Sequence, residues 1–245
     1  MVAYPGRPLV QSVASRQKSA VDLVLHEIRR AILTGDLPPG KPFTVPALTA
    51  RLGVSHVPVR EALRQLEAQG LIVLSPSRSA IVTPLDPEDL QAIYRLRLRL
   101  EPELAAQSAV RRTQDEITEF DHLVRTAFSA ELAEDEHWDI HRKFHKALIT
   151  PAAAAWDFRL LTPLWDAAER YTRLVFDPVM ASADVRQARE RSHDRLTAAA
   201  NSRDPEQVRD GLRRHLESNV TQTLSALNAM ARTESTAWLR DDQTA

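Results

Sequence analysis

Residues 52–67 read LGVSHVPVREALRQLE. Gly53-Val54-Ser55 predicts a tight turn, and the residues before it, from Pro46 to Leu52, predict a short helix. After the turn, apolar residues recur at helical spacing and form one inward stripe: Val59, Ala62, Leu63 and Leu66. Pro58 falls in the first turn of this helix, where proline is tolerated. The stretch therefore predicts two helices joined by a tight turn.

The flanking segments complete a domain. Upstream, residues 19–34 predict a helix of about four turns, ended by Gly35-Asp36. Downstream, Gly70 ends the third helix, and residues 71–74 and 80–83 predict two strands around a polar loop. Three helices followed by a hairpin is the order of a winged helix-turn-helix, which we place at residues 19–84. Residues 1–18 show no apolar periodicity and are expected to form a mobile arm.

The remainder of the chain is predicted to be helical. Asp86-Pro87 is a strong helix start, so the domain boundary is expected near residues 83–86. Six segments with helical periodicity and no strand alternation follow, at residues 88–111, 114–131, 135–150, 155–176, 183–201 and 205–231. They predict an antiparallel bundle of about six helices that encloses a pocket, over residues 85–231, with a frayed polar tail at 232–245. The fold class is mainly α.

Length and composition fit two separate cores in one soluble chain. The 245 residues suffice for two domains. With no Cys, the chain has no disulfide, no thiolate metal site and no cysteine nucleophile. It has no uncharged apolar run of about 18 residues, and its start lacks the apolar core of a signal peptide. We expect a cytoplasmic protein with no membrane partner.

The net charge of -1 conceals an uneven distribution. Residues 1–83 carry ten Lys and Arg against five Asp and Glu, a net charge of +5, and the remaining 22 basic and 28 acidic residues give -6. A basic first third is expected if only this part meets phosphate.

These residues resemble a known family, the GntR superfamily of bacterial transcription regulators. The winged-helix signature is carried by Gly35-Asp36-Leu37, Pro39-Gly40, Leu48, Leu52-Gly53-Val54-Ser55, Pro58-Val59-Arg60-Glu61-Ala62-Leu63, Leu66-Glu67 and Gly70-Leu71-Ile72. The second part resembles the FCD effector domain of the FadR-like branch through Arg97, Glu101, Phe144-His145, His193 and His215-Leu216. The resemblance implies a ligand-responsive regulator of a catabolic operon. It also implies a small organic acid as effector, and a homodimer that binds a palindromic operator in double-stranded DNA.

The exposed face of the third helix offers polar and cationic side chains for DNA. The resemblance implies contacts from Ser55, His56 and Arg60, and Arg64 lies on the same face. Arg78, at the predicted wing tip, can reach phosphate or the minor groove. The alternative for each of these charges is a solvated surface residue. The sequence departs from the family at His56, where Arg is usual, and at Ser79, where Gly is usual.

Four histidines fall on inward helix faces. His141 and His145 are four residues apart on a face with Phe144 and Leu148, and two further helices each present one histidine beside apolar residues, His193 and His215. Neutral imidazoles hold divalent cations, although a single buried histidine is more often part of the core. Many FCD domains bind metal through an Asp or Asn and three His. The resemblance therefore implies a divalent transition metal, zinc or nickel, at His141, His145, His193 and His215, with His141 in place of the acid.

Arg97 lies between Ile93 and Leu100 on an apolar helix stripe, where an unpaired guanidinium would be costly. It needs an anion. Glu101, one turn on, is one candidate partner, and an effector carboxylate, as the family resemblance implies, is the other.

Two other functions fit parts of the sequence. Glu134 with His137 and Glu190 with His193 have the Glu-x-x-His spacing of di-iron bundle enzymes, but that interpretation leaves the Arg60 motif unexplained. A DNA-binding protein whose helical domain only dimerises is the second alternative. We expect a regulator and not an enzyme.

Overall fold

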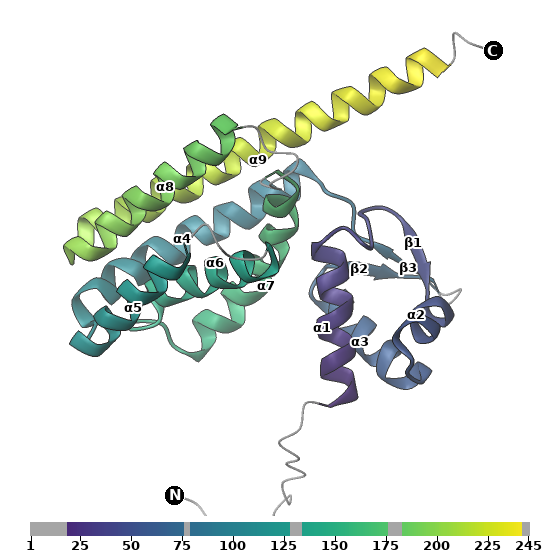
Figure 1. Cartoon of the computed structure of the whole chain (residues 1–245), viewed down its shortest axis with the longest axis horizontal. Coiled ribbons are helices and arrows are strands. Elements are labelled where there is room, and N and C mark those ends of the chain that lie inside the picture. Colours follow the sequence, from purple (N-terminus) through teal and green to yellow (C-terminus); the bar gives the residue numbers. More distant parts are fainter. Residues whose placement is uncertain (1–18, 76–78, 128–133, 176–182, 242–245) are drawn as a thin grey trace, which may run out of the picture. The chain divides into compact units, whose positions relative to one another are not determined.

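The computed structural model describes residues 19–75, 79–127, 134–175 and 183–241. The chain divides into two compact units, residues 1–82 and residues 83–245, and each is described by itself (Figure 1).

The first unit combines three helices with a small sheet. Its elements are α1 (Ala20–Leu33), β1 (Pro42–Thr44), α2 (Val45–Leu52), α3 (His56–Ala68), β2 (Ile72–Leu74) and β3 (Ser79–Val82). Ser19 begins α1 with a capping box, in which its hydroxyl accepts from the Asp22 amide and the Asp22 carboxylate accepts from the Ser19 amide. The predicted stripe of α3 is buried, since Val59, Ala62, Leu63 and Leu66 are all at most 1% exposed. This confirms the predicted winged-helix fold.

The sheet has one strand more than the predicted hairpin. The strand order is β1-β3-β2, with both neighbouring pairs antiparallel. Phe43 of β1 lies opposite Ala80 of β3, and Val73 of β2 lies opposite Ile81. The strand at residues 42–44 is not predicted by the sequence pattern. Three residues are too few to show a period, and their hydrogen-bonding partner lies far along the chain.

The turn between α2 and α3 depends on Gly53. Its backbone has φ 65° and ψ 30°, the left-handed conformation that other residues adopt only at a cost. The Gly53 amide donates to the Thr49 carbonyl at 3.0 Å, which closes α2. Ser55 then starts α3 as its N-cap, so the two helices are joined by three residues.

Within the described residues, the second unit consists of six helices. They are α4 (Pro87–Arg111), α5 (Gln114–Ala127), α6 (Glu134–Ile149), α7 (Ala155–Val175), α8 (Ala183–Ser202) and α9 (Pro205–Asp241). Asp86 caps α4 through a 2.7 Å hydrogen bond from the Glu88 amide, with Pro87 at the first helical position, as predicted. Asp204 caps α9 in the same way, accepting from the Glu206 amide at 2.9 Å.

The last helix extends further than predicted. The sequence pattern predicts that this helix ends at residue 231 and that a frayed tail follows, whereas α9 continues to Asp241 and projects beyond the start of α8 (Figure 1). Residues 232–241 contain no Gly or Pro to stop a helix, although they show no apolar stripe that would predict one.

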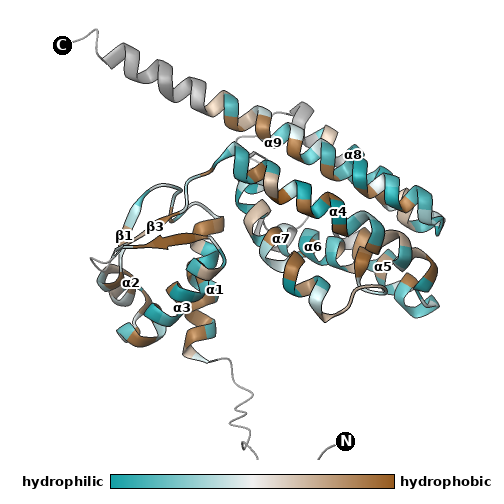
Figure 2. Cartoon of the chain, turned by 180° about the vertical axis from the view of Figure 1, so that it is seen from behind, coloured by the Kyte–Doolittle hydropathy of each residue, from teal (hydrophilic) through white to brown (hydrophobic). Residues whose placement is uncertain are grey.

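The core of the second unit is formed mainly by α4, α6, α7, α8 and α9. Its large buried side chains include Tyr94, Phe144, Leu161 and Leu196. In Figure 2, α8 is mostly hydrophilic. His193 on this helix is nevertheless only 1% exposed, whereas the next two residues, Asp194 and Arg195, are exposed. A buried polar side chain on such a helix requires partners inside the bundle.

Candidate DNA-binding surface and metal centre

The third helix presents its predicted polar residues to solvent. Ser55, His56, Arg60 and Arg64 are all exposed; Ser55 is the N-cap of α3, and the other three recur every four residues outside its buried stripe. The Ser55 hydroxyl makes no capping hydrogen bond, so it is open to a ligand. Arg64 lies 3.6 Å from Glu61 in an exposed pair, which contributes little to stability and leaves the cation accessible.

A hollow of about 360 Å³ lies beside this face in the first unit. It is lined by Val45, Arg60, Leu63, Arg64, Leu74, Ser75 and Ser79, which come from α2, α3 and the hairpin. Two arginines and two serines therefore face the same space. Such a set suits a phosphate backbone, because guanidinium groups neutralise phosphates and hydroxyls donate to their oxygens.

The wing has Ser79 at a position where glycine is usual in the family, and its backbone is not strained there. Ser79 lies in β3, paired with Thr44 of β1. Among non-glycine residues of the described chain, only Arg203 has a positive φ, so Ser79 needs no glycine conformation. Arg78, the predicted wing-tip contact, lies outside the described residues.

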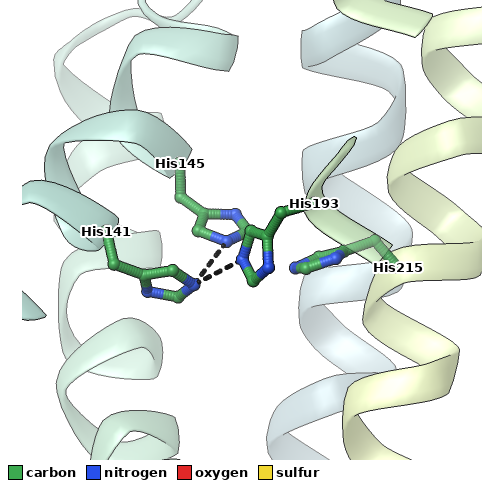
Figure 3. A group of neighbouring side chains, drawn as sticks. All are labelled: His141, His145, His193 and His215. Atoms are coloured by element: carbon green, nitrogen blue, oxygen red, sulfur yellow. Dashed lines mark hydrogen bonds between the residues drawn. The ribbon is translucent and has the colours of Figure 1, made fainter. Parts of the chain in front are cut away.

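The second unit brings all four predicted histidines together. His141 and His145 project from α6 towards His193 of α8 and His215 of α9 (Figure 3). His145, His193 and His215 are buried, and His141 is partly buried. One ligand nitrogen from each ring lies within 4.8 Å of the others. The inward faces inferred from the sequence thus converge on one point.

The distances between the rings suit a bound cation. The Nε2 atoms of His141 and His193 are 2.9 Å apart, and those of His141 and His145 are 3.3 Å apart. A zinc ion about 2.0 Å from two ligands at a tetrahedral angle separates them by about 3.3 Å. Such close nitrogens repel through their lone pairs unless a proton or a cation lies between them. The donor set and its spacing therefore fit a divalent transition metal.

Hydrogen bonds orient the fourth ring. The Ser192 hydroxyl lies 3.0 Å from His215 Nδ1, and the Asn219 amide nitrogen lies 3.1 Å from His215 Nε2. Contacts of this kind fix ring orientation, which matters to a metal as much as the ligand identity does.

Arg97, the predicted effector contact, is paired with Glu101. Its Nε donates to Glu101 Oε1 at 2.6 Å and its Nη2 lies 3.4 Å from Oε2, and both residues are buried. Burial alone lowers the pKa of the guanidinium, but Glu101 and Tyr94 outweigh it, so the pKa of Arg97 is raised. Trp165 Nε1 also donates to Glu101, at 2.9 Å. Of the two candidate partners for Arg97, Glu101 and an effector carboxylate, the structure thus shows Glu101.

A cavity of about 40 Å³ lies between Arg97 and the histidines. Its lining includes Tyr94, Arg97, Trp138, His141, Arg142, His145, Trp165, Ala168, Glu169, Thr172 and Asn219. The Tyr94 hydroxyl is buried beside Arg97, and burial raises its pKa. A buried hydroxyl and a guanidinium beside a cation site are suited to carboxylate oxygens.

Comparison with known families identifies both units. Residues 21–82 match the bacterial regulatory proteins of the gntR family, and residues 92–218, just over half of the chain, match the FCD domain. The chain belongs to the GntR family. It is a DNA-binding transcription regulator with an FCD domain, and its relatives are regulators and not enzymes.

Known proteins that are similar over most of this chain support the family assignment. It is 29% identical to the uncharacterized HTH-type transcriptional regulator BphR of Paraburkholderia xenovorans, over 83% of this chain and 85% of that protein. It is 26% identical to the HTH-type transcriptional repressor GlaR of Escherichia coli, over 77% of this chain and 89% of GlaR. The solved structure of E. coli McbR/YncC shares the fold, with a TM-score of 0.73 and 22% identity over 85% of this chain and 99% of that one.

The di-iron alternative does not survive the family assignment. The side chains of Glu134, His137 and Glu190 lie outside the described residues, and His193 faces the other three histidines. No helix in the described ranges is long and apolar enough to cross a membrane.

Several residues that line the cavity beside the histidines were not predicted from the sequence. Arg142 directly follows His141, and Asn219 lies one helical turn after His215, so both could have been inferred from their spacing to a histidine. Trp138 precedes His141 by three residues, on the same face. Trp165 and Glu169 had no comparable signal, because the rotation of α7 in the bundle is set by packing.

Proposed function

We propose that this GntR regulator, of the FadR-like branch, binds a palindromic operator as a homodimer and controls a catabolic operon in the cytoplasm. A small organic acid, held with the help of zinc or nickel in the FCD domain, sets its affinity for DNA. The observation that carries this proposal is the convergence of four imidazoles, with ligand nitrogens within 4.8 Å of one another, beside a cavity with arginines.

On the DNA side, Ser55, His56, Arg60 and Arg64 are assigned to the operator. Their exposure on one face of α3 and the hollow shared with the wing support this assignment. Arg78 is assigned to phosphate or to the minor groove at the wing tip. His56 in place of the usual Arg removes one strong guanine contact, so the operator differs from those of relatives with Arg at this position.

On the effector side, His141, His145, His193 and His215 are assigned to the metal. A bound metal supplies a Lewis-acidic site for a carboxylate oxygen. Arg97 is assigned to the effector because it lines the same cavity. Glu101 holds its guanidinium in place through two of the three nitrogens, and Trp165 in turn donates to Glu101. Binding that differs between two placements of the DNA-binding units then changes operator affinity.

Metal analysis combined with DNA footprinting tests the proposal. Untagged full-length protein is analysed for bound metal, and its footprint on DNA flanking its own gene is recorded with zinc, with nickel and with a panel of organic acids. We expect about one metal ion per chain and a footprint that at least one acid weakens or strengthens about fivefold or more.

Two outcomes would contradict it. Protein that binds DNA but takes up no metal would favour the alternative in which the helical domain only dimerises. An unchanged footprint with every acid that demonstrably binds would reject the coupling between effector and operator.

A further inference from the structure

The first residues of the second unit are held by two side chains of α7. Arg170 Nη2 donates to the Thr83 carbonyl at 2.8 Å and to the Pro84 carbonyl at 3.3 Å. The Tyr171 hydroxyl donates to the Asp86 carbonyl at 3.2 Å and accepts from the Asp86 amide at 3.3 Å. We call this set of contacts the linker latch: Arg170 and Tyr171 bound to residues 83–86.

Arg170, which binds the linker, is a buried cation. It is only 5% exposed, and it donates hydrogen bonds to two backbone carbonyls. Burial lowers its pKa, opposed by Tyr171 and Asp89 nearby. If these carbonyls moved away, a buried cation would lose two acceptors, which is costly. The latch therefore favours one position of residues 83 and 84 over others.

Charged contacts between α6 and α7 lie next to the histidines on one side and to the latch on the other, along the two helices. Arg142, next to His141 on α6, donates to Glu169 of α7 and lies 3.6 Å from Asp166. Glu169 also accepts from Arg173 Nε at 2.8 Å, and it directly precedes Arg170. The α6 residue next to His141 and the α7 residue next to Arg170 are thus joined by an ion pair.

One turn of α7 serves both sites. Ala168, Glu169 and Thr172 line the cavity, whereas Arg170 and Tyr171 bind the linker. At about 100° per residue, these two sets lie on opposite faces of the helix. Any movement of this turn that adjusts the cavity also moves the latch.

The chain connects the latch directly to the DNA-binding unit. Val82, the last residue of β3, accepts from the Gly40 amide at 2.8 Å within its own unit. The next residue, Thr83, is already bound by Arg170. No residue therefore separates the latch from the end of β3 along the chain.

We propose that Arg170 and Tyr171 are the positioning residues through which occupancy of the histidine site reaches the winged-helix unit. The inference rests on the proposed metal function and adds its route: α6, then Arg142 with Glu169, then the latch, then β3. Both residues act through the linker, and neither lines the cavity beside the histidines.

Hydrogen exchange with zinc as the probe tests the route. The full-length protein is stripped with EDTA and then loaded with Zn²⁺, and amide exchange is followed by mass spectrometry in peptides covering residues 83–90. In the wild type, zinc should slow this exchange at least about fivefold, the lower end of typical coupling between sites. Tyr171→Phe and Arg170→Gln should bind zinc within about twofold of the wild type but lose the slowing, to less than about twofold.

Tyr171→Phe removes only a hydroxyl and keeps the test valid if Arg170→Gln fails to fold. Arg209→Gln, an outer arginine of α9 paired with Glu103, is the matched control and should behave as the wild type. Full slowing in folded Tyr171→Phe would overturn the latch. If the wild type binds zinc but exchange at residues 83–90 does not change, the latch is overturned and the proposed metal function stands. If the wild type binds no zinc, both are overturned.

Discussion

The imidazole of His193 lies within 5 Å of both the His141 and His215 rings, centroid to centroid. If the four histidines hold a metal as proposed, replacing His193 by Ala removes one of four ligands and should weaken metal binding at least about tenfold. We expect His193→Ala to carry less than half the wild-type metal after dialysis, measured by plasma mass spectrometry. His26→Ala, an exposed histidine of α1, should retain full metal, and equal loss in both variants would contradict the assignment.

The buried pair of Arg97 and Glu101 contributes to stability as a unit. Replacing Glu101 by Ala leaves the Arg97 guanidinium and the Trp165 N–H without their acceptor inside the bundle. We expect Glu101→Ala to lower the free energy of unfolding by about 3 to 5 kcal/mol in urea titrations. Glu103→Ala, an exposed acid on the same helix, should cost less than about 1 kcal/mol. Similar losses for the two variants would show that the buried pair has no special role.

Arg60 tests the DNA-binding face at the same scale. It is exposed and forms no ion pair with any described residue, so its substitution should leave folding intact. We expect Arg60→Ala to weaken operator binding by about 1 to 3 kcal/mol and to reduce the salt dependence by about one released counterion. Fluorescence anisotropy at several salt concentrations measures both, and Arg209→Ala serves as the control. An unchanged salt slope with weaker binding would instead indicate a role without phosphate contact.

Among the elements, the helices were predictable from sequence because their apolar stripes are long enough to repeat. The α3 stripe and the caps at Asp86 and Asp204 are clear local signals. The strand β1 was missed, because its pairing with β3 is a non-local contact that three residues do not encode. The histidines were predictable from faces of single helices, but the contact of Arg142 with Glu169 depends on how α6 and α7 pack together.

The turn between α2 and α3 gives a prediction at this scale. A Cβ at Gly53 would meet no atom within 4 Å, so the cost of a side chain there comes from its φ of 65° alone. We expect Gly53→Ala to destabilise the protein by about 1 to 2 kcal/mol, and Gly53→Asn by less, because Asn tolerates this conformation better. Chemical denaturation followed by circular dichroism measures both. Equal costs for the two variants would mean that crowding, and not backbone conformation, limits this turn.

For the whole molecule, the separation of charge implies that DNA is bound through the first unit. That unit carries the excess of ten basic over five acidic residues, and the second unit is acidic and repels the duplex. A single winged helix covers only one half-site, so the proposed palindromic operator would be bound by two copies of the chain related by a two-fold axis. We expect sedimentation to show a dimer, and footprinting on its operator to show two inverted half-sites whose centres lie about one helical turn, about 10 bp, or a multiple of it apart. Inserting about 5 bp between the half-sites should abolish tight binding, because it turns one half-site to the opposite face of the duplex, whereas about 10 bp should restore part of it. Binding that is indifferent to both insertions would mean that each chain recognises DNA alone.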